Sequence, residues 1–176
     1  MILKKFKYKK ISSTNDVAVI KIKQGYRKGI VVSDVQTKGK GQYGKSWVSS
    51  KGNLFLSVFY IINKKIQISS LIKSNLRIIK KILSRYTKSN IKIKSPNDIM
   101  INKKKICGIL NETLFYGNLK FIVIGIGINI SNSPNLRDYP TTFLNEITKR
   151  KISKIEIFNQ IVRAFEVEIK WLLLEI

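Results

Sequence analysis

The amino-acid sequence predicts an α+β fold in which a mixed, mostly antiparallel sheet is flanked by helices. Apolar runs of strand length occur at residues 29–36, 53–61 and 119–130. Helical spacing of apolar residues marks 67–87, and a second helical stripe follows Ser153. The resulting order is strand, helix, two strands, helix, then hairpin strands and helices. This order is typical of an α+β domain.

The first half of the chain is expected to hold three strands and two helices. Residues 1–10 alternate and form a short edge strand, and the polar residues 11–15 cap a helix that reaches about Lys23 and stops at Gly25. Strands follow at 29–36 and 53–61. The amphipathic helix at 67–87 is defined by apolar residues at helical spacing: Ile68, Leu71, Ile72, Leu76, Ile79, Leu83 and Tyr86.

The second half is expected to continue with strands and end in helices. A short strand at 91–94 precedes a hairpin that pairs 99–101 with 105–112, and an apolar strand covers 119–130. An irregular crossing with two prolines leads to a short helix capped by Thr141 or Thr142. The final helix begins with a capping box from Ser153 to Glu156. At 176 residues, the whole chain fits one domain, residues 1–176.

Composition excludes several classes of chemistry. With no histidine, a serine–histidine–aspartate triad and the commonest metal ligand are both ruled out. One cysteine, Cys107, allows neither an internal disulfide nor a thiolate zinc site, and its apolar neighbours predict a small buried core residue. No signal peptide or membrane-spanning run is found. We therefore expect a cytoplasmic protein without a membrane partner.

The formal charge of +24 is large, but it is spread along the whole chain and carried mainly by lysine. Such an excess is compatible with a basic nucleic-acid-binding protein, which is one alternative. Unclustered lysines with few arginines favour instead a compositional bias on solvated faces. We expect no specific nucleic-acid partner.

Two segments carry candidate chemistry. Gly39-Lys-Gly-Gln-Tyr-Gly-Lys45 is a cationic, glycine-rich loop that precedes a strand, so it is neither a P-loop nor a dinucleotide fingerprint. Its glycines permit close backbone approach to a ligand, and its lysines suit phosphate, although an ordinary solvated connection is the alternative. Lys94 ends a strand before a turn that Pro96 restricts and that Asn97 and Asp98 are expected to stiffen through local hydrogen bonds.

The chain resembles the biotin–protein ligases in the order of its motifs: Ser12–Asn15, Gln36, Gly39–Trp47, Gly52–Ser57, Lys94–Asp98, Lys105–Glu112 and Gly125–Asn129. The resemblance covers roughly residues 11–130. It implies the class II synthetase-like catalytic domain shared by biotin and lipoate ligases. It also implies an enzyme that forms biotinyl-5′-AMP from biotin and MgATP, then passes the biotinyl group to one lysine of an apo biotin carboxyl carrier protein.

Site residues follow from the resemblance position by position. Lys94 and Lys40 take the catalytic positions. The implied biotin-binding residues are Ser13, Thr14, Asn15, Gln36, Gly39, Lys40, Gly41, Gln42 and Lys94. The implied ATP- and adenylate-binding residues are Lys40, Gln42, Trp47, Lys94 and Asn129. No metal ligands are assigned, so Mg²⁺ is expected without a known site.

This chain departs from the family's usual pattern at several points. The loop has Lys40, Gln42 and Lys45 where arginines are usual, which removes bidentate contacts and, at Gln42, a charge. Ser95 replaces a tryptophan beside Lys94. The residues before Ser12 are too few for a helix-turn-helix, and we expect no C-terminal β-barrel. A lipoate or octanoate ligase or transferase is the nearest alternative function, and a homodimer is compatible with either activity.

Overall fold

One seven-stranded sheet organises the protein. The structure, a computed structural model, describes residues 2–136 and 139–174, with side chains of the last helix described as far as Leu172. The strand order is β1-β2-β3-β7-β6-β5-β4. The strands are β1 (Lys5–Ile11), β2 (Lys28–Gln36), β3 (Leu54–Ile62), β4 (Ile91–Lys94), β5 (Asp98–Ile101), β6 (Lys104–Tyr116) and β7 (Leu119–Ile128). Only the β1–β2 pair is parallel, which confirms the predicted mixed, mostly antiparallel sheet.

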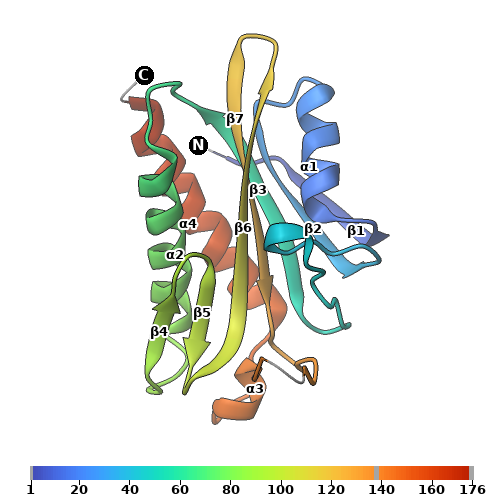
Figure 1. Ribbon diagram of the computed structural model, residues 1–176, viewed down its shortest axis with the longest axis vertical. Helices are drawn as coiled ribbons and strands as arrows, with labels where there is room; N and C mark the ends of the chain where they lie inside the picture. The colour runs from blue at the N-terminus through green and yellow to red at the C-terminus, as the bar shows by residue number, and fades with distance from the viewer. Residues whose placement is uncertain (1, 137–138, 175–176) are drawn as a thin grey trace.

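Helices cover the two faces of the sheet unequally (Figure 1). The helix α1 (Thr14–Lys23) packs on one face through Ala18 and Ile22. The opposite face is covered by α2 (Ile68–Leu83) and α4 (Lys154–Leu174), which lie side by side. Because α1 covers only part of its face, the remainder of that face is available to loops and ligands.

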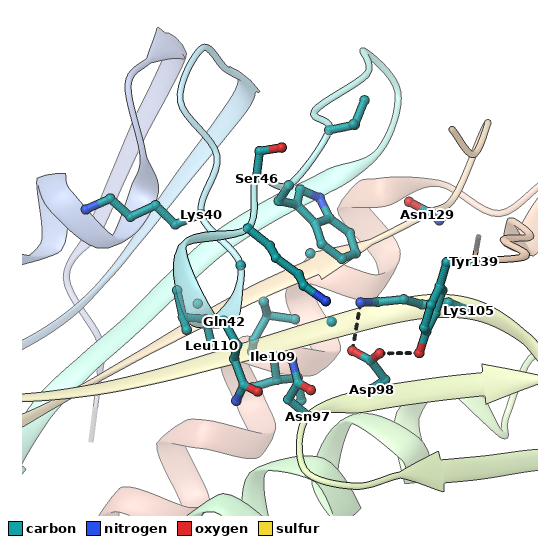
Figure 2. A pocket seen from close by; sticks show the side chains of 18 of the residues that line it. Lys40, Gln42, Ser46, Asn97, Asp98, Lys105, Ile109, Leu110, Asn129 and Tyr139 are labelled. Atoms are coloured by element: carbon teal, nitrogen blue, oxygen red, sulfur yellow. Dashed lines mark hydrogen bonds and ion pairs between the residues drawn. The ribbon is translucent and has the colours of Figure 1, made fainter. Parts of the chain in front are cut away.

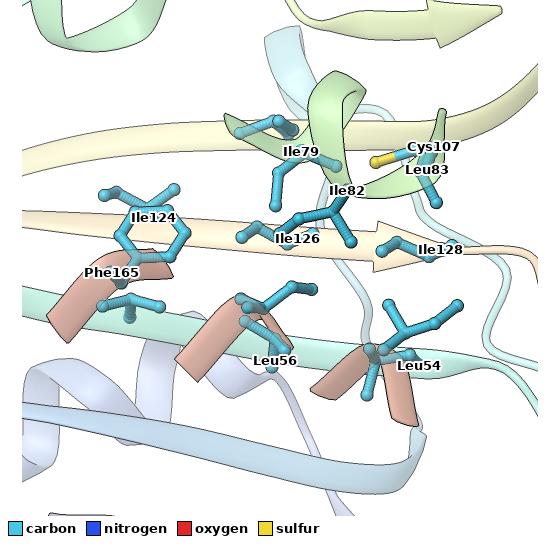
Figure 3. Packing of buried hydrophobic residues seen from close by; sticks show 14 of the residues in the cluster. Leu54, Leu56, Ile79, Ile82, Leu83, Cys107, Ile124, Ile126, Ile128 and Phe165 are labelled. Carbon is cyan, nitrogen blue, oxygen red and sulfur yellow. The ribbon is translucent and has the colours of Figure 1, made fainter. Parts of the chain in front are cut away.

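The main core lies between the sheet and the pair α2 and α4 (Figure 3). Leu56 on β3 and Ile126 on β7 meet Ile79 of α2 and Phe165 of α4, and all four are almost completely buried. The sheet centre is apolar on both faces because β3 and β7 are covered from both sides. This explains why their sequences read as continuous apolar runs.

Cys107 lies in this core on β6 and is fully buried, as predicted. Burial raises the pKa of its thiol, so the side chain stays neutral and unreactive. Among the described residues, no helix combines the length and apolar character needed to cross a bilayer.

Several local predictions were wrong. Phe143, not Thr141 or Thr142, occupies the N-cap of the short helix α3 (Leu144–Ile147), because the Thr142 hydroxyl bonds instead to the Glu146 carboxylate. No capping box forms at α4. The Ser153 hydroxyl accepts from the Ile155 amide, while the Glu156 carboxylate binds Arg150.

The second strand of the β5–β6 hairpin is longer than expected. β6 continues to Tyr116 and turns at Gly117, which has a φ of 57°, into β7. The long β6–β7 hairpin was not predicted, although Gly117 and Asn118 at its turn are residue types that favour turns. It matters for the site, because it places two glycine-bearing strands next to one another.

Candidate functional site

A cavity of about 450 Å³ lies on the α1 side of the sheet. It is bounded by the glycine-rich loop, the β4–β5 turn and the crossing after β7. Most of the predicted site residues line it: Ser13, Thr14, Asn15, Gln36, Lys40, Gly41, Gln42, Trp47, Lys94 and Asn129. Gly39 does not, and lines instead a neighbouring recess that Glu112 also lines.

Paired glycines form the floor of the cavity. Gly108 on β6 is the direct register partner of Gly127 on β7. An added Cβ would lie 2.6 Å from the Trp47 indole at Gly108 and 2.5 Å from it at Gly127. The indole therefore rests against bare backbone, and no other residue type fits beneath it. These close contacts give a physical reason for glycine in the middle of two strands.

A third glycine seats a polar side chain. Gly125 lies so close to Asn15 that an added Cβ would come within 2.4 Å of the Asn15 amide oxygen. That oxygen accepts from the Ser57 hydroxyl on β3, and the Asn15 amide nitrogen donates to Glu112 on β6 at 2.5 Å. Both ends of the amide are thus assigned by partners of opposite hydrogen-bonding type, which fixes its orientation.

The start of α1 is linked to the end of β2 through a glutamine. The Thr14 backbone amide and hydroxyl both donate to the Gln36 side-chain oxygen, at 2.7 and 3.0 Å. The Gln36 amide nitrogen donates to the Ser49 hydroxyl at 3.1 Å. Ser13 occupies the N-cap position of α1 but makes no capping hydrogen bond with its side chain. Its buried hydroxyl is therefore free to contact a ligand in the cavity.

The glycine-rich loop folds on itself above the cavity. The Gly41 amide donates to the Lys45 carbonyl at 2.7 Å, enclosing a short 3-10 turn, η1 (Gln42–Gly44). Tyr43 in that turn has a φ of 54° and is almost entirely exposed. Lys40 turns away from the cavity centre to pair with Asp16 of α1 (Figure 2). The hydrogen bond that the Lys40 ammonium donates to Asp16 raises the pKa of this ammonium group.

A second charged group lies at the opposite end of the cavity, around a buried carboxylate (Figure 2). Asp98 pairs with the Lys105 ammonium at 2.8 Å and accepts from the Tyr139 hydroxyl at 2.5 Å. The Lys94 ammonium lies 4.5 Å from the centre of the Tyr139 ring. The prediction that Asp98 stiffens its own turn was wrong, because its side chain binds Lys105 on the neighbouring strand β6 and Tyr139 in the crossing segment instead.

Apart from the Asp98 oxygen that is ion-paired with Lys105, two polar atoms on the cavity wall have no hydrogen-bond partner among the described residues: the Trp47 indole nitrogen and the Asn129 side-chain oxygen. The Asn129 nitrogen is used, since it donates to the Thr142 carbonyl at 3.2 Å. A buried donor or acceptor without a partner costs free energy. A donor and an acceptor left free on one wall indicate a polar ligand that completes them.

Lys105, Asp98 and Glu112 lie within the motifs of the sequence, but no role in the site was predicted for them. The predicted β5–β6 hairpin could have drawn attention to Asp98, because Asp98 pairs directly with Gly108 on β6. Tyr139 was missed entirely. It lies in the irregular crossing, where neither periodicity nor spacing predicts which way a side chain points.

Comparison with known proteins assigns this arrangement to a family. The pattern of the biotin/lipoate A/B protein ligase family matches residues 8–129, which include the predicted loop and lysine motifs. The chain belongs to this family. This match confirms the fold prediction, and together with the relatives that follow it confirms the resemblance to biotin–protein ligases.

Individual relatives of this ligase family agree. The chain is 31% identical to biotin–protein ligase 2 of Arabidopsis thaliana over 89% of its own length and 50% of that protein. It is 31% identical to the bifunctional ligase/repressor BirA of Bacillus subtilis over 78% of the chain and 44% of that protein. The chain thus spans about half the length of these curated relatives.

A solved ligase structure matches in three dimensions as well. The biotin protein ligase of Leishmania major, in complex with biotinyl-5-AMP, superposes with a TM-score of 0.77 at 27% identity. The match covers 92% of this chain and 72% of that one. The ligase-family fold therefore extends through the described helices and strands.

Proposed function

We propose that this chain is an ATP-dependent biotin–protein ligase, with residues 1–176 carrying the catalytic unit. In the first step a biotin carboxylate oxygen attacks the α-phosphorus of ATP. An acyl–phosphate bond forms, a phosphoanhydride bond breaks, and pyrophosphate leaves. In the second step the amine of a carrier lysine attacks the acyl carbon, loses a proton, and AMP leaves. The observation that carries the proposal is one cavity with a fixed polar network at one end and two ammonium groups at the other.

The polar end suits the ureido ring of biotin. Thr14, Asn15 and Gln36 are held by hydrogen bonds that assign their donors and acceptors before any ligand arrives. Preorganised groups of this kind cost little to order on binding. Ser13 offers an additional hydroxyl in the same corner.

The charged end suits the reacting carboxylate and phosphates. Lys94 and Lys105 both lie close to the Tyr139 ring, where their charges would stabilise the negative charge that develops on the α-phosphate oxygens. Trp47 would contact adenine through its ring, and Asn129 would accept from its amino group. We infer that Mg²⁺ arrives with ATP, because this ion usually binds through phosphate and water. No cluster of three acidic, histidine or cysteine side chains occurs in the described part of the chain.

The glycine-rich loop would close over the adenylate. Gly39 and Gly41 allow the backbone to approach the ligand, and the flanking lysines bring positive charge to its phosphate. Closure would keep water from a mixed anhydride that hydrolyses easily. The closed loop requires Lys40 to exchange Asp16 for the phosphate, since one ammonium group cannot fully serve both. We place this reaction in the cytoplasm, where ATP and an apo biotin carboxyl carrier protein meet.

Lipoate or octanoate activation is the second candidate, because the matched family includes lipoate ligases. The polar network disfavours it. An octanoyl chain has no group to pair with the buried Ser13 hydroxyl, which makes no capping hydrogen bond, and leaving a buried polar atom without a partner costs about 1–3 kcal/mol. A site built to hydrogen-bond its substrate rejects the apolar analogue strongly.

Pyrophosphate release from MgATP tests the proposal. We expect release to depend on biotin and to be absent with octanoate or lipoate at the same concentration. Mass spectrometry of the nucleotide product should then find biotinyl-AMP. Release with octanoate alone would support the second candidate, and no release with any of the three acids would reject ligase activity.

A further inference from the structure

Tyr139 lies at the centre of the charged end of the cavity. Its ring centre is 4.5 Å from the Lys94 ammonium and 5.2 Å from the Lys105 ammonium. Its hydroxyl donates to Asp98, the carboxylate that also pairs with Lys105. One half-buried side chain therefore contacts both candidate cations and their nearest anion.

The backbone next to Tyr139 is fixed to the same strand as Lys105. The Lys105 amide donates to the Pro140 carbonyl at 2.8 Å, and the Thr142 amide donates to the Lys105 carbonyl at 3.0 Å. These bonds form a short parallel bridge between β6 and the crossing segment. The backbone that carries the Tyr139 ring is therefore held at a fixed distance from the Lys105 backbone by two hydrogen bonds.

The chemistry of the tyrosine suits this place. Two ammonium groups close together repel each other, and the face of an aromatic ring attracts cations at these distances. Burial and the Asp98 carboxylate both raise the pKa of the Tyr139 hydroxyl, so it remains a hydrogen-bond donor. The ring thus attracts the two cations, while its hydroxyl donates to the carboxylate that pairs with Lys105.

We propose that Tyr139 is a positioning residue that holds Lys94 and Lys105 ready for the phosphates of ATP. The proposal rests on the ligase function above only for the identity of the phosphate ligand. It assigns a role to the crossing segment, whose sequence offers no motif. It also supplies an aromatic neighbour to Lys94 from outside the Lys94–Asp98 segment, in which Ser95 has no aromatic side chain.

The kinetic test compares Tyr139→Leu with Tyr139→Phe and with Tyr116→Leu. Tyr116 is a matched control, because its hydroxyl also makes one hydrogen bond, to the Lys23 carbonyl, far from the cavity. Cation–ring contacts of this kind correspond to roughly 2- to 30-fold in affinity. We expect Tyr139→Leu to raise the KM for ATP by about tenfold with little change in the KM for biotin. Tyr139→Phe should keep most of the affinity, and Tyr116→Leu should match the wild type.

An NMR measurement separates this proposal from the ligase function. Ring currents of Tyr139 should shift the ε-methylene resonances of Lys94 and Lys105, assigned with Lys94→Arg and Lys105→Arg. The Lys94 shift should be lost in Tyr139→Leu, whereas the Lys105 shift should only decrease, because the Trp47 ring also lies 5.2 Å from the Lys105 ammonium. Both shifts should be kept in Tyr139→Phe, and pyrophosphate titration should move the same resonances. Equal rises in both KM values, or no ring-current shift in the wild type, would overturn the role of Tyr139. A wild type without biotin-dependent pyrophosphate release would reject the ligase function alone, and the resonances would still decide on Tyr139.

Discussion

Substitution of Gly127 by alanine tests the glycine floor directly. The new Cβ would lie 2.5, 2.7 and 2.8 Å from three atoms of the Trp47 indole. Carbon atoms in contact prefer about 3.5 Å or more, so the indole has to move by roughly 1 Å. β7 cannot yield, because it is hydrogen-bonded to β3 on one side and β6 on the other. The indole has to yield instead, since it belongs to the loop before β3.

The expected effect is on ligand binding more than on stability. Overpacking of a fixed site costs about 1–3 kcal/mol, which corresponds to roughly 5- to 150-fold in a dissociation constant. Because Trp47 can move outward, we expect most of this cost in the binding of ATP or the adenylate. The free energy of unfolding should fall by less than 1 kcal/mol.

Fluorescence reports the movement in a Trp171→Phe background, which leaves Trp47 as the single tryptophan. The control is Gly29→Ala. Its new Cβ would lie 2.7 Å from the Phe59 ring, but Gly29 does not line the cavity. It should lower stability without changing ligand affinity. Unchanged Trp47 emission and unchanged ATP affinity in Gly127→Ala would refute the packing argument.

Three further predictions concern charges. Lys94→Gln should cost about 2–4 kcal/mol of transition-state stabilisation in kcat/KM, whereas Lys80→Gln, on α2, should cost almost nothing; equal losses would contradict a role for Lys94. Gln42→Arg should slow release of biotinyl-AMP and reduce labelling of a bystander protein. An unchanged off-rate of the adenylate would show that the missing charge at Gln42 does not weaken its retention. The Arg150 guanidinium lowers the pKa of Glu156, so this contribution to stability is present above the unfolded pKa of about 4.3 and is lost as pH falls. Urea titrations between pH 3 and 6 should therefore show a weaker acid dependence in Glu156→Gln.

Much of the fold could be predicted from local patterns. Apolar runs identified β3 and β7, helical periodicity identified α2 and α4, and Gly25 ended α1 as expected. These features depend on side-chain spacing along one element, which the sequence displays directly. The capping predictions failed because Thr142 and Glu156 had competing partners elsewhere in the fold.

The candidate site divides in the same way. Asn15, Gln36, Trp47 and Lys94 were predicted from the order of motifs, and they line one cavity. Sequence alone did not show that Lys40 pairs with Asp16 or that Gly39 lies outside the cavity. Both facts depend on how the glycine-rich loop turns over α1.

The sequence by itself determined the class of fold, the family and the segments that carry the chemistry, because these reside in local pattern and in motif order. Only the tertiary structure decided which side chains meet. The register that places Gly108 beside Gly127 creates room for Trp47, and the bridge from β6 to Thr141 brings Tyr139 to Lys94. Contacts between such distant segments are set by strand pairing and chain crossing, and no local pattern encodes them.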